Sequence, residues 1–91
     1  MYLIRYSKKF KKDFKKFRHD KDIIAEMKFV ISCIASGDKL PSKYKNHRLL
    51  GEFNQHMECH LRPDLLLVYE IRNNELLLLL VRLGSHSELF G

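Results

Sequence analysis

The chain has 91 residues, which allows one small domain and excludes a multidomain architecture. Hydrophobic residues make up 45% of it and charged residues 31%, a composition typical of a folded chain and not of a disordered one. Its 17 Lys and Arg against 11 Asp and Glu give a formal net charge of +6, which favours an anionic partner, with nucleic acid first. Most of the basic residues, 13 of 17, lie in residues 1–45, so we expect a basic helical half followed by an apolar framework.

Residues 2–6 predict a short strand that leads into a helix. Ser7 follows the strand and is typical of a helix N-cap. Three phenylalanines then recur at i, i+4 and i+7, the spacing that lines one helix face: Phe10, Phe14 and Phe17. We therefore expect a helix that begins after Ser7 and buries this aromatic face.

A second helix follows a short polar link. Asp20 or Asp22 can cap its start, and apolar residues recur at helical spacing over residues 23–34. Gly37 stands where a helix-ending glycine belongs. The short link predicts that the two helices form an antiparallel hairpin.

The second half of the chain predicts strands. Residues 38–46 indicate a loop, because they contain a proline that disfavours helix. Three later stretches carry strand patterns: residues 53–60, 65–71 and 76–83. Asn73 and Asn74 predict the tight turn before the last strand. One strand, two helices and then a three-stranded antiparallel meander indicate a single α+β domain over residues 1–91, with the helices packed on one face of the sheet.

Six lysines cover the faces of the first helix that the phenylalanines leave free: Lys8, Lys9, Lys11, Lys12, Lys15 and Lys16. Nearly all the charge in this segment has one sign, so i,i+4 ion pairing cannot account for it. The segment is a candidate surface for gripping RNA phosphates, and an acidic protein partner is the alternative. A solvated helix face has the same composition and is the usual outcome of a charge run.

Cysteine usage and hydropathy predict a cytoplasmic protein without a membrane partner. Cys33 and Cys59 are too few for a disulfide scaffold and too far apart for a CxxC metal knuckle, so we interpret them as free thiols in a reducing compartment. The N-terminus lacks the apolar segment and cleavage site of a secretory signal. The longest apolar run, residues 76–81, is far too short to span a bilayer.

Side chains that can carry chemistry gather in the second half, at predicted strand ends and loops. His47, His60 and His86 lie there, Asp64 follows His60 by four residues across a turn, and Arg82 is on the last strand. Imidazoles can take a proton from a ribose 2′-OH and give one to a leaving 5′-oxygen, and an arginine can stabilise the charge on phosphorus. On residue types alone, metal-free RNA cleavage is one option among several.

A metal site is another option. His56, Glu58 and His60 fall on one face of the predicted strand 53–60, in a two-histidine, one-carboxylate pattern. Alternating polar residues are also the default on an exposed sheet face. We therefore expect no metal and no other cofactor.

Three stretches together resemble the YafQ branch of the RelE/ParE toxin superfamily, the toxin halves of bacterial type II toxin–antitoxin pairs: residues 46–51 (NHRLLG), 58–69 (ECHLRPDLLLVY) and 82–90 (RLGSHSELF). The spacing H-x-L-x-G, H-x-x-P-D-x-L-L-x-Y and R-x-G-[ST]-H-x-x-L-F is kept throughout. The resemblance covers nearly the whole chain, including the basic helices. It implies a compact α+β endoribonuclease that cuts mRNA on the 70S ribosome, inhibits translation and is held by a cognate antitoxin.

By position, the functional residues of the family fall on His47, His60, Asp64, His86 and Phe90, and Arg82 matches a basic position often found in the superfamily. We interpret His86 as the general acid, with Asp64 or His60 as the base and the other orienting it. Phe90 is expected to stack on a base or to pack under His86. His56 departs from the family, which usually has an aromatic residue there, so a pocket wall is changed or an imidazole is added. A non-catalytic RNA- or partner-binding module is the alternative hypothesis for the whole chain.

Overall fold

Side-chain caps fix where the two N-terminal helices begin. Ser7 Oγ accepts a hydrogen bond from the N–H of the third residue of α1 (Lys8–Phe14). Asp20 Oδ1 accepts two backbone N–H groups in the first turn of α2 (Lys21–Ala35), so Asp20, and not Asp22, is the cap. Both helices therefore start where short polar side chains satisfy their free N–H groups.

The five strands form one mixed sheet with the order β1-β5-β4-β3-β2. Their bounds are Leu3–Tyr6 for β1, His47–Arg48 for β2, Met57–Arg62 for β3, Leu65–Arg72 for β4 and Leu77–Gly84 for β5. The predicted antiparallel meander is confirmed in β3, β4 and β5, with a tight turn at Asn73–Glu75. The sequence did not predict that β1 pairs in parallel with β5, or that β2 adds a fifth strand at the other edge.

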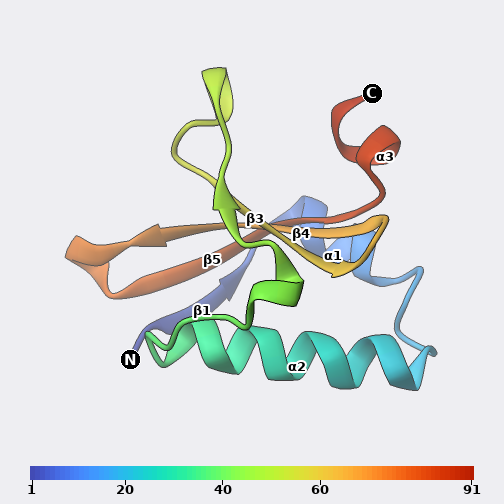
Figure 1. The fold of residues 1–91 in the computed structure, drawn as a ribbon, viewed down its shortest axis with the longest axis horizontal. Coiled ribbons are helices and arrows are strands. Elements are labelled where there is room, and N and C mark those ends of the chain that lie inside the picture. Colours follow the sequence, from blue (N-terminus) through green and yellow to red (C-terminus); the bar gives the residue numbers. More distant parts are fainter.

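The predicted strand over residues 53–60 is wrong at its start. Gly51–Phe53 form a single 3-10 turn that begins with Gly51 at a φ of +71°, and the N–H of His56 then donates to the carbonyl of Phe53. These bonds turn the chain away from the sheet, so pairing begins only at Met57. The computed structural model describes residues 1–91, and it shows this segment rising from the sheet as a separate prong (Figure 1).

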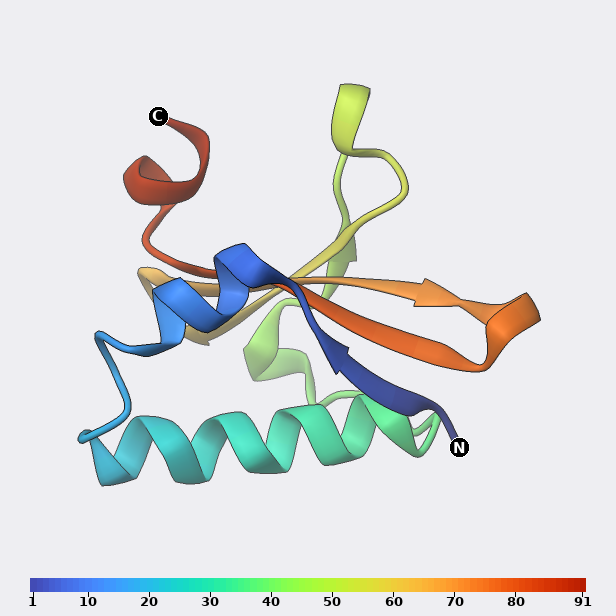
Figure 2. The ribbon, with the colours of Figure 1, turned by 180° about the vertical axis from the view of Figure 1, so that it is seen from behind.

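The two faces of the sheet have different covers. α2 lies along one face, and the hydrophobic core fills the space between them (Figures 1 and 2). The core is built from alternate strand residues and the apolar stripe of α2: Met27, Val30, Ile34, Cys59, Leu67, Tyr69, Leu78 and Leu80 among them. The Gly51–Phe53 turn and a C-terminal helix, α3 (His86–Phe90), rise from the opposite face. That opposite face is therefore the one left for a site.

α3 is not among the elements predicted from the sequence, although its start carries a cap signature. Ser85 Oγ accepts the N–H of Glu88, and Glu88 Oε1 accepts the N–H of Ser85, which together make a capping box. Gly84 allows the close approach, because a Cβ at that position would lie 3.1 Å from the Glu88 carboxylate and 3.2 Å from Leu89. The chain can therefore fold back sharply from β5 into α3.

α1 packs mainly on β5 and covers the edge of β5 that β1 leaves open. Ser7 donates to the carbonyls of Leu80 and Val81, and Asp13 Oδ2 accepts the N–H of Leu83. These edge groups of β5 are thereby paired by the backbone N–H and hydroxyl of Ser7 and by the Asp13 carboxylate, and not by another strand. α1 ends at Phe14 and does not continue to Phe17, whose N–H instead closes a tighter turn onto the Phe14 carbonyl.

Neither cysteine is in a disulfide, as predicted. Burial raises the pKa of the Cys59 thiol to about 12, and the neighbouring Glu58 charge adds to the effect. Cys59 is therefore an inert core thiol. None of the helices is both long and apolar enough to cross a membrane.

Candidate active site

The face of the sheet opposite α2 gathers titratable side chains from four separate segments. His47 comes from β2, Glu58 and His60 from β3, Asp64 from the turn between β3 and β4, and His86 from the start of α3. The strand register fixes the distance from His60 to the start of α3, because His60 pairs with Leu66 and Leu66 pairs with Gly84. His60 is therefore two strand spacings, about 10 Å, from the point where α3 begins.

A buried carboxylate lies between two of the predicted histidines. Glu58 is only 3% exposed, and its Oε2 lies 3.0 Å from His47 Nε2 and 3.9 Å from His60 Nε2. His47 Nδ1 lies 2.7 Å from the carbonyl oxygen of Lys45. Both ring nitrogens of His47 thus face oxygens, which fix the orientation of the ring between Glu58 and Lys45.

The same three side chains have the chemistry of a metal site. One ligand atom each from His47, Glu58 and His60 lies within 4.8 Å of the others, and Glu58 Oε1 is buried without a hydrogen-bond partner. Two imidazoles and a carboxylate suit a transition metal, which as a Lewis acid would polarise a phosphoryl oxygen. The ligand set considered as an option from sequence differs in one member, because His56 precedes β3 and its Nε2 lies 3.6 Å from Glu70 instead.

A second group of predicted residues forms around α3. The backbone N–H of His86 donates to Asp64 Oδ1 at 3.2 Å, which ties the β3–β4 turn to the start of the helix. The ring of Phe90 lies 5.3 Å from the ring of His86, centroid to centroid. Phe90 also meets Phe53 edge to face at 5.7 Å. The C-terminal phenylalanine is therefore half-buried against its neighbours and not loose at the chain end.

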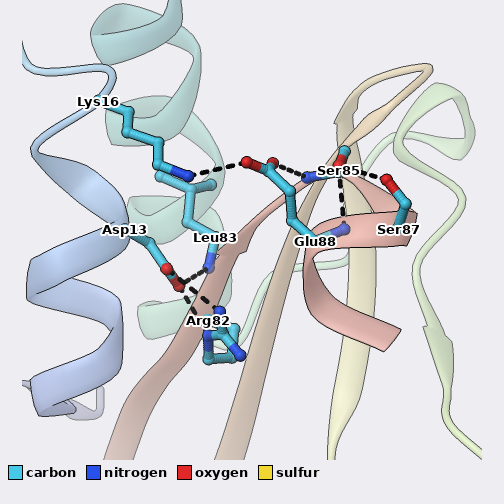
Figure 3. Close-up of polar contacts among 7 residues, drawn as sticks. All are labelled: Asp13, Lys16, Arg82, Leu83, Ser85, Ser87 and Glu88. Atoms are coloured by element: carbon cyan, nitrogen blue, oxygen red, sulfur yellow. Dashed lines mark hydrogen bonds and ion pairs between the residues drawn. The ribbon is translucent and has the colours of Figure 1, made fainter. Parts of the chain in front are cut away.

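Arg82 is held by α1 (Figure 3). Its Nε and Nη2 donate to the two carboxylate oxygens of Asp13 at 2.8 and 3.2 Å, and Asp13 also accepts the N–H of Leu83. Burial raises the pKa of Asp13, but hydrogen bonds from Arg82 and Leu83 outweigh it, so the net pKa is lowered. The Asp13 hydrogen bond in turn raises the pKa of Arg82. Arg82 is thus a fixed cation beside α3 with one nitrogen, Nη1, left for another acceptor.

A second ion pair lies nearby and joins Lys16, in the turn just after α1, to Glu88 of α3 (Figure 3). Lys16 Nζ lies 2.8 Å from Glu88 Oε2, and both side chains are largely exposed. The Lys16 hydrogen bond, followed by those from Ser85, lowers the pKa of Glu88 to about 2. α1 and the turn that follows it therefore contact both ends of the segment that runs from Arg82 to α3.

The six lysines of the first helix are all exposed, but they lie in different surroundings. Lys16 is paired with Glu88, Lys11 borders a groove between α1 and α2, and Lys9 lines a small cleft under Phe90. The six lysines therefore do not all face the same part of the molecular surface.

Three residues that shape the site were missed or misjudged from sequence. Asp13 stands alone among lysines, which is a signal that it has a specific partner. Glu58 is predicted only as a metal ligand, and the sequence carries no signal of its burial, because the alternation puts it on the polar side of the predicted strand. Phe53 carries no usable signal either, because the predicted strand over residues 53–60 puts it on the same side as Met57 and Cys59.

Comparisons with known proteins agree on one family. The model of a family described as a bacterial toxin of type II toxin–antitoxin systems, YafQ, matches residues 2–91. An mRNA interferase toxin YafQ from Escherichia coli K12 is 30% identical over 89 residues, which cover 97% of this chain and 95% of that one.

Two solved structures extend the likeness to the fold. The crystal structure of a metal-bound toxin from Helicobacter pylori is 48% identical, covers 99% of this chain and 100% of that one, and superposes with a TM-score of 0.92. In the crystal structure of the E. coli DinJ–YafQ complex, the similar chain is 32% identical over the whole of both chains, with a TM-score of 0.84.

Proposed function

Because the chain belongs to the YafQ family of bacterial type II toxin–antitoxin toxins, we propose that residues 1–91 act as a single-domain endoribonuclease that cuts mRNA on the ribosome without a metal ion. The observation that carries the proposal is that His60, Asp64 and His86 come from neighbouring segments on one side of the sheet, where Asp64 accepts the backbone N–H of His86 and Arg82 of β5 is a fixed cation. Proton acceptors, a proton donor and a phosphate-binding cation are what 2′-OH attack requires.

The reaction begins when a base, His60 or Asp64, takes the proton from the ribose 2′-OH. The 2′-oxygen then bonds to the adjacent phosphorus, and the bond from phosphorus to the 5′-oxygen of the next nucleotide breaks. His86 gives its proton to that 5′-oxygen. Arg82, through the Nη1 that Asp13 leaves free, stabilises the added negative charge on the phosphoryl oxygens. The products are a 2′,3′-cyclic phosphate and a free 5′-OH.

The test is cleavage of a defined mRNA on purified ribosomes. His86→Ala is expected to lower the cleavage rate by ~10²–10⁴-fold, the usual effect of losing a general acid. Ribosome binding should stay intact, because the hydrogen bond that ties His86 to Asp64 is made by the backbone N–H. A His86→Ala protein that cuts at the wild-type rate would remove His86 as the general acid, whereas a wild-type protein that binds ribosomes and leaves the mRNA uncut would favour a non-catalytic binding module.

We further propose that an acidic, amphipathic segment of a cognate antitoxin docks in the groove between β1, α1 and α2. The groove has a volume of about 570 Å³ and is lined by apolar side chains, with Tyr6 half exposed at one end. Lys11 and Lys28 border it, so apolar anchors flanked by carboxylates are complementary to it. The support from a relative is the DinJ–YafQ complex.

Ile31 tests this docking surface, because it lines the groove and lies on the far side of the sheet from the site. In cytoplasmic co-expression with the small acidic protein encoded beside the toxin gene, Ile31→Glu should lose the complex and keep cleavage activity. Co-purification of Ile31→Glu at the wild-type level would place the antitoxin elsewhere.

A further inference from the structure

A cluster of cations around one carboxylate lies next to His60, at the end of β3. It lines a pocket of about 200 Å³ that is bordered by α2 and by the 3-10 turn Ser42–Tyr44, which lies between the sheet and α2 (Figures 1 and 2). Three basic side chains of the pocket face a single acidic one, Glu26: Lys43, Lys45 and Arg62. Three positive charges against one negative charge favour an anionic ligand.

Glu26 keeps two of the cations nearby without taking up their N–H donors. Lys43 Nζ lies 4.0 Å from Glu26 Oε2 and Arg62 Nε lies 3.6 Å from Glu26 Oε1, and both distances are longer than a hydrogen bond. Arg72 and Arg82, by contrast, donate to carboxylates at 2.7 and 2.8 Å. The guanidinium of Arg62 therefore keeps the pair of donors with which an arginine binds a phosphate through two hydrogen bonds.

The turn around Tyr44 holds the cluster in place. Tyr44 is 4% exposed and its hydroxyl donates to Glu26 Oε2 at 2.6 Å, which fixes the carboxylate. The Lys43 ammonium lies 5.1 Å from the centroid of the Tyr44 ring, within the range of a cation–π contact. Lys45 follows with a φ of +49°, and both chain neighbours of Tyr44 line the same pocket. Cations that are positioned before a ligand arrives lose less freedom when they bind it.

The cluster adjoins a group that the proposed reaction uses. His60 lines the same pocket, and its Nε2 lies 3.9 Å from Glu58 on the site face, so its ring borders both places. We propose that Lys43 and Arg62 bind a phosphate of the mRNA other than the one that is cut, and so guide the strand past His60. This inference deepens the proposed function, on which it rests. Contacts to the sugar–phosphate backbone position a strand without reading its sequence, so Lys43 and Arg62 are binding residues and not catalytic ones.

The experiment uses ribosomes programmed with mRNAs that each carry one methylphosphonate, a linkage without charge, one or two nucleotides from the cleavage site. With wild-type protein, one of these replacements should raise KM by roughly 10-fold, as loss of a charge-assisted hydrogen bond does. Arg62→Ala should raise KM on the unmodified mRNA by a similar factor and cause no added loss on that methylphosphonate mRNA. In both cases kcat should change little, because this phosphate does not react.

A change at Glu26 should have the opposite sign. In Glu26→Gln the side-chain amide still accepts the hydroxyl of Tyr44, but the negative charge between the cations is removed. KM on the unmodified mRNA should then fall by about 2- to 3-fold, the effect of one charge near a phosphate in water. A KM that does not fall would overturn the proposal, because ion pairs that only support the fold gain nothing from this change.

Matched controls separate phosphate binding from support of the fold. Arg72→Ala removes an arginine that already donates to Glu70, and Lys39→Ala removes an exposed lysine outside the pocket. Both variants should keep the wild-type KM. Lys43→Ala should behave as Arg62→Ala does, with its loss absent on the same methylphosphonate mRNA.

The proposal is also overturned if every methylphosphonate mRNA is cut with the normal KM, or if the loss from Arg62→Ala multiplies with the loss from each methylphosphonate. Weaker binding of Arg62→Ala to ribosomes without mRNA would assign the phosphate to ribosomal RNA and overturn it. An Arg62→Ala protein that cuts normally but no longer binds an acidic antitoxin would overturn it in favour of a protein ligand. Failure of the proposed function looks different, because wild-type protein would then leave the unmodified mRNA uncut.

Discussion

Replacing Asp13 by alanine is expected to destabilise the protein more than a substitution in an exposed, lysine-rich helix usually does. The change removes the three hydrogen bonds that fix Arg82 and the N–H of Leu83. The side chains of Asp13 and Arg82 are only 13% and 27% exposed, so water replaces the lost partners incompletely. Hydrogen bonds to charged groups contribute about 1.5–3 kcal/mol each, and Arg82 can turn partly toward solvent, so we expect a loss of about 2–4 kcal/mol.

The assay is urea unfolding followed by circular dichroism, with thermal unfolding as a second measure. For a domain of this size, 1 kcal/mol shifts Tm by ~4–8 °C, so Asp13→Ala should lower Tm by at least about 8 °C. Lys16→Ala, in the turn just after α1, is the control. It breaks an exposed ion pair to Glu88, which solvent screens, so Tm should change little.

A double-mutant cycle decides whether the Arg82 pairing is the cause. Asp13→Ala and Arg82→Ala should show a coupling energy of ~1–3 kcal/mol, as residues in one hydrogen-bond network do. If the two losses simply add, or if Asp13→Ala costs less than ~0.5 kcal/mol, the idea that α1 fixes Arg82 is refuted.

Three other outcomes are expected. Replacing Lys8, Lys12 and Lys15 together by alanine should flatten the salt dependence of ribosome binding, because fewer phosphate counterions are released. An unchanged slope would mean that these lysines form only a solvated helix face. Phe90→Ala should lower cleavage while Tm changes little, whereas a fall of several degrees with a proportionate loss of activity would mark Phe90 as core. The Glu88 carboxylate, with its pKa lowered to about 2 from an ordinary 4.5, favours the folded state fully above about pH 4.5 and loses this effect as pH falls toward 2. Amide shifts of α3 followed by NMR should move over that window in the wild type and not in Glu88→Gln.

Local signals predicted much of the fold, because caps and periodicity act within a few residues. Ser7 and Asp20 satisfy helix N–H groups next to them in the chain, and the predictions made from them are confirmed. The Asn73–Asn74 turn and the three-strand meander are likewise local. α3 could have been found from Ser85 and Glu88, but a five-residue helix is too short for a periodic pattern.

Features that depend on distant partners could not be predicted in this way. Asp13 meets Arg82 across 69 residues of sequence, and no periodicity connects them. The strand alternation suggested His56 beside Glu58 and His60, but the turn at Gly51–Phe53 displaces His56, and pairing of β2 with β3 brings His47 there instead. The site residues taken from the resemblance lie in two groups, one around Glu58 and one around α3, and their chemical roles stay predictions.

The end groups of the cleaved mRNA test the central claim most directly. A defined message is cut on purified ribosomes in Mg²⁺, with and without a chelator selective for transition metals, and both fragments are analysed by mass spectrometry. Attack by the 2′-OH predicts a 5′-hydroxyl on the downstream fragment, a 2′,3′-cyclic or 3′-phosphate on the upstream one, and an unchanged rate with chelator. A 5′-phosphate on the downstream fragment would contradict 2′-OH attack, and loss of cleavage with the chelator would assign the reaction to a metal held by His47, Glu58 and His60.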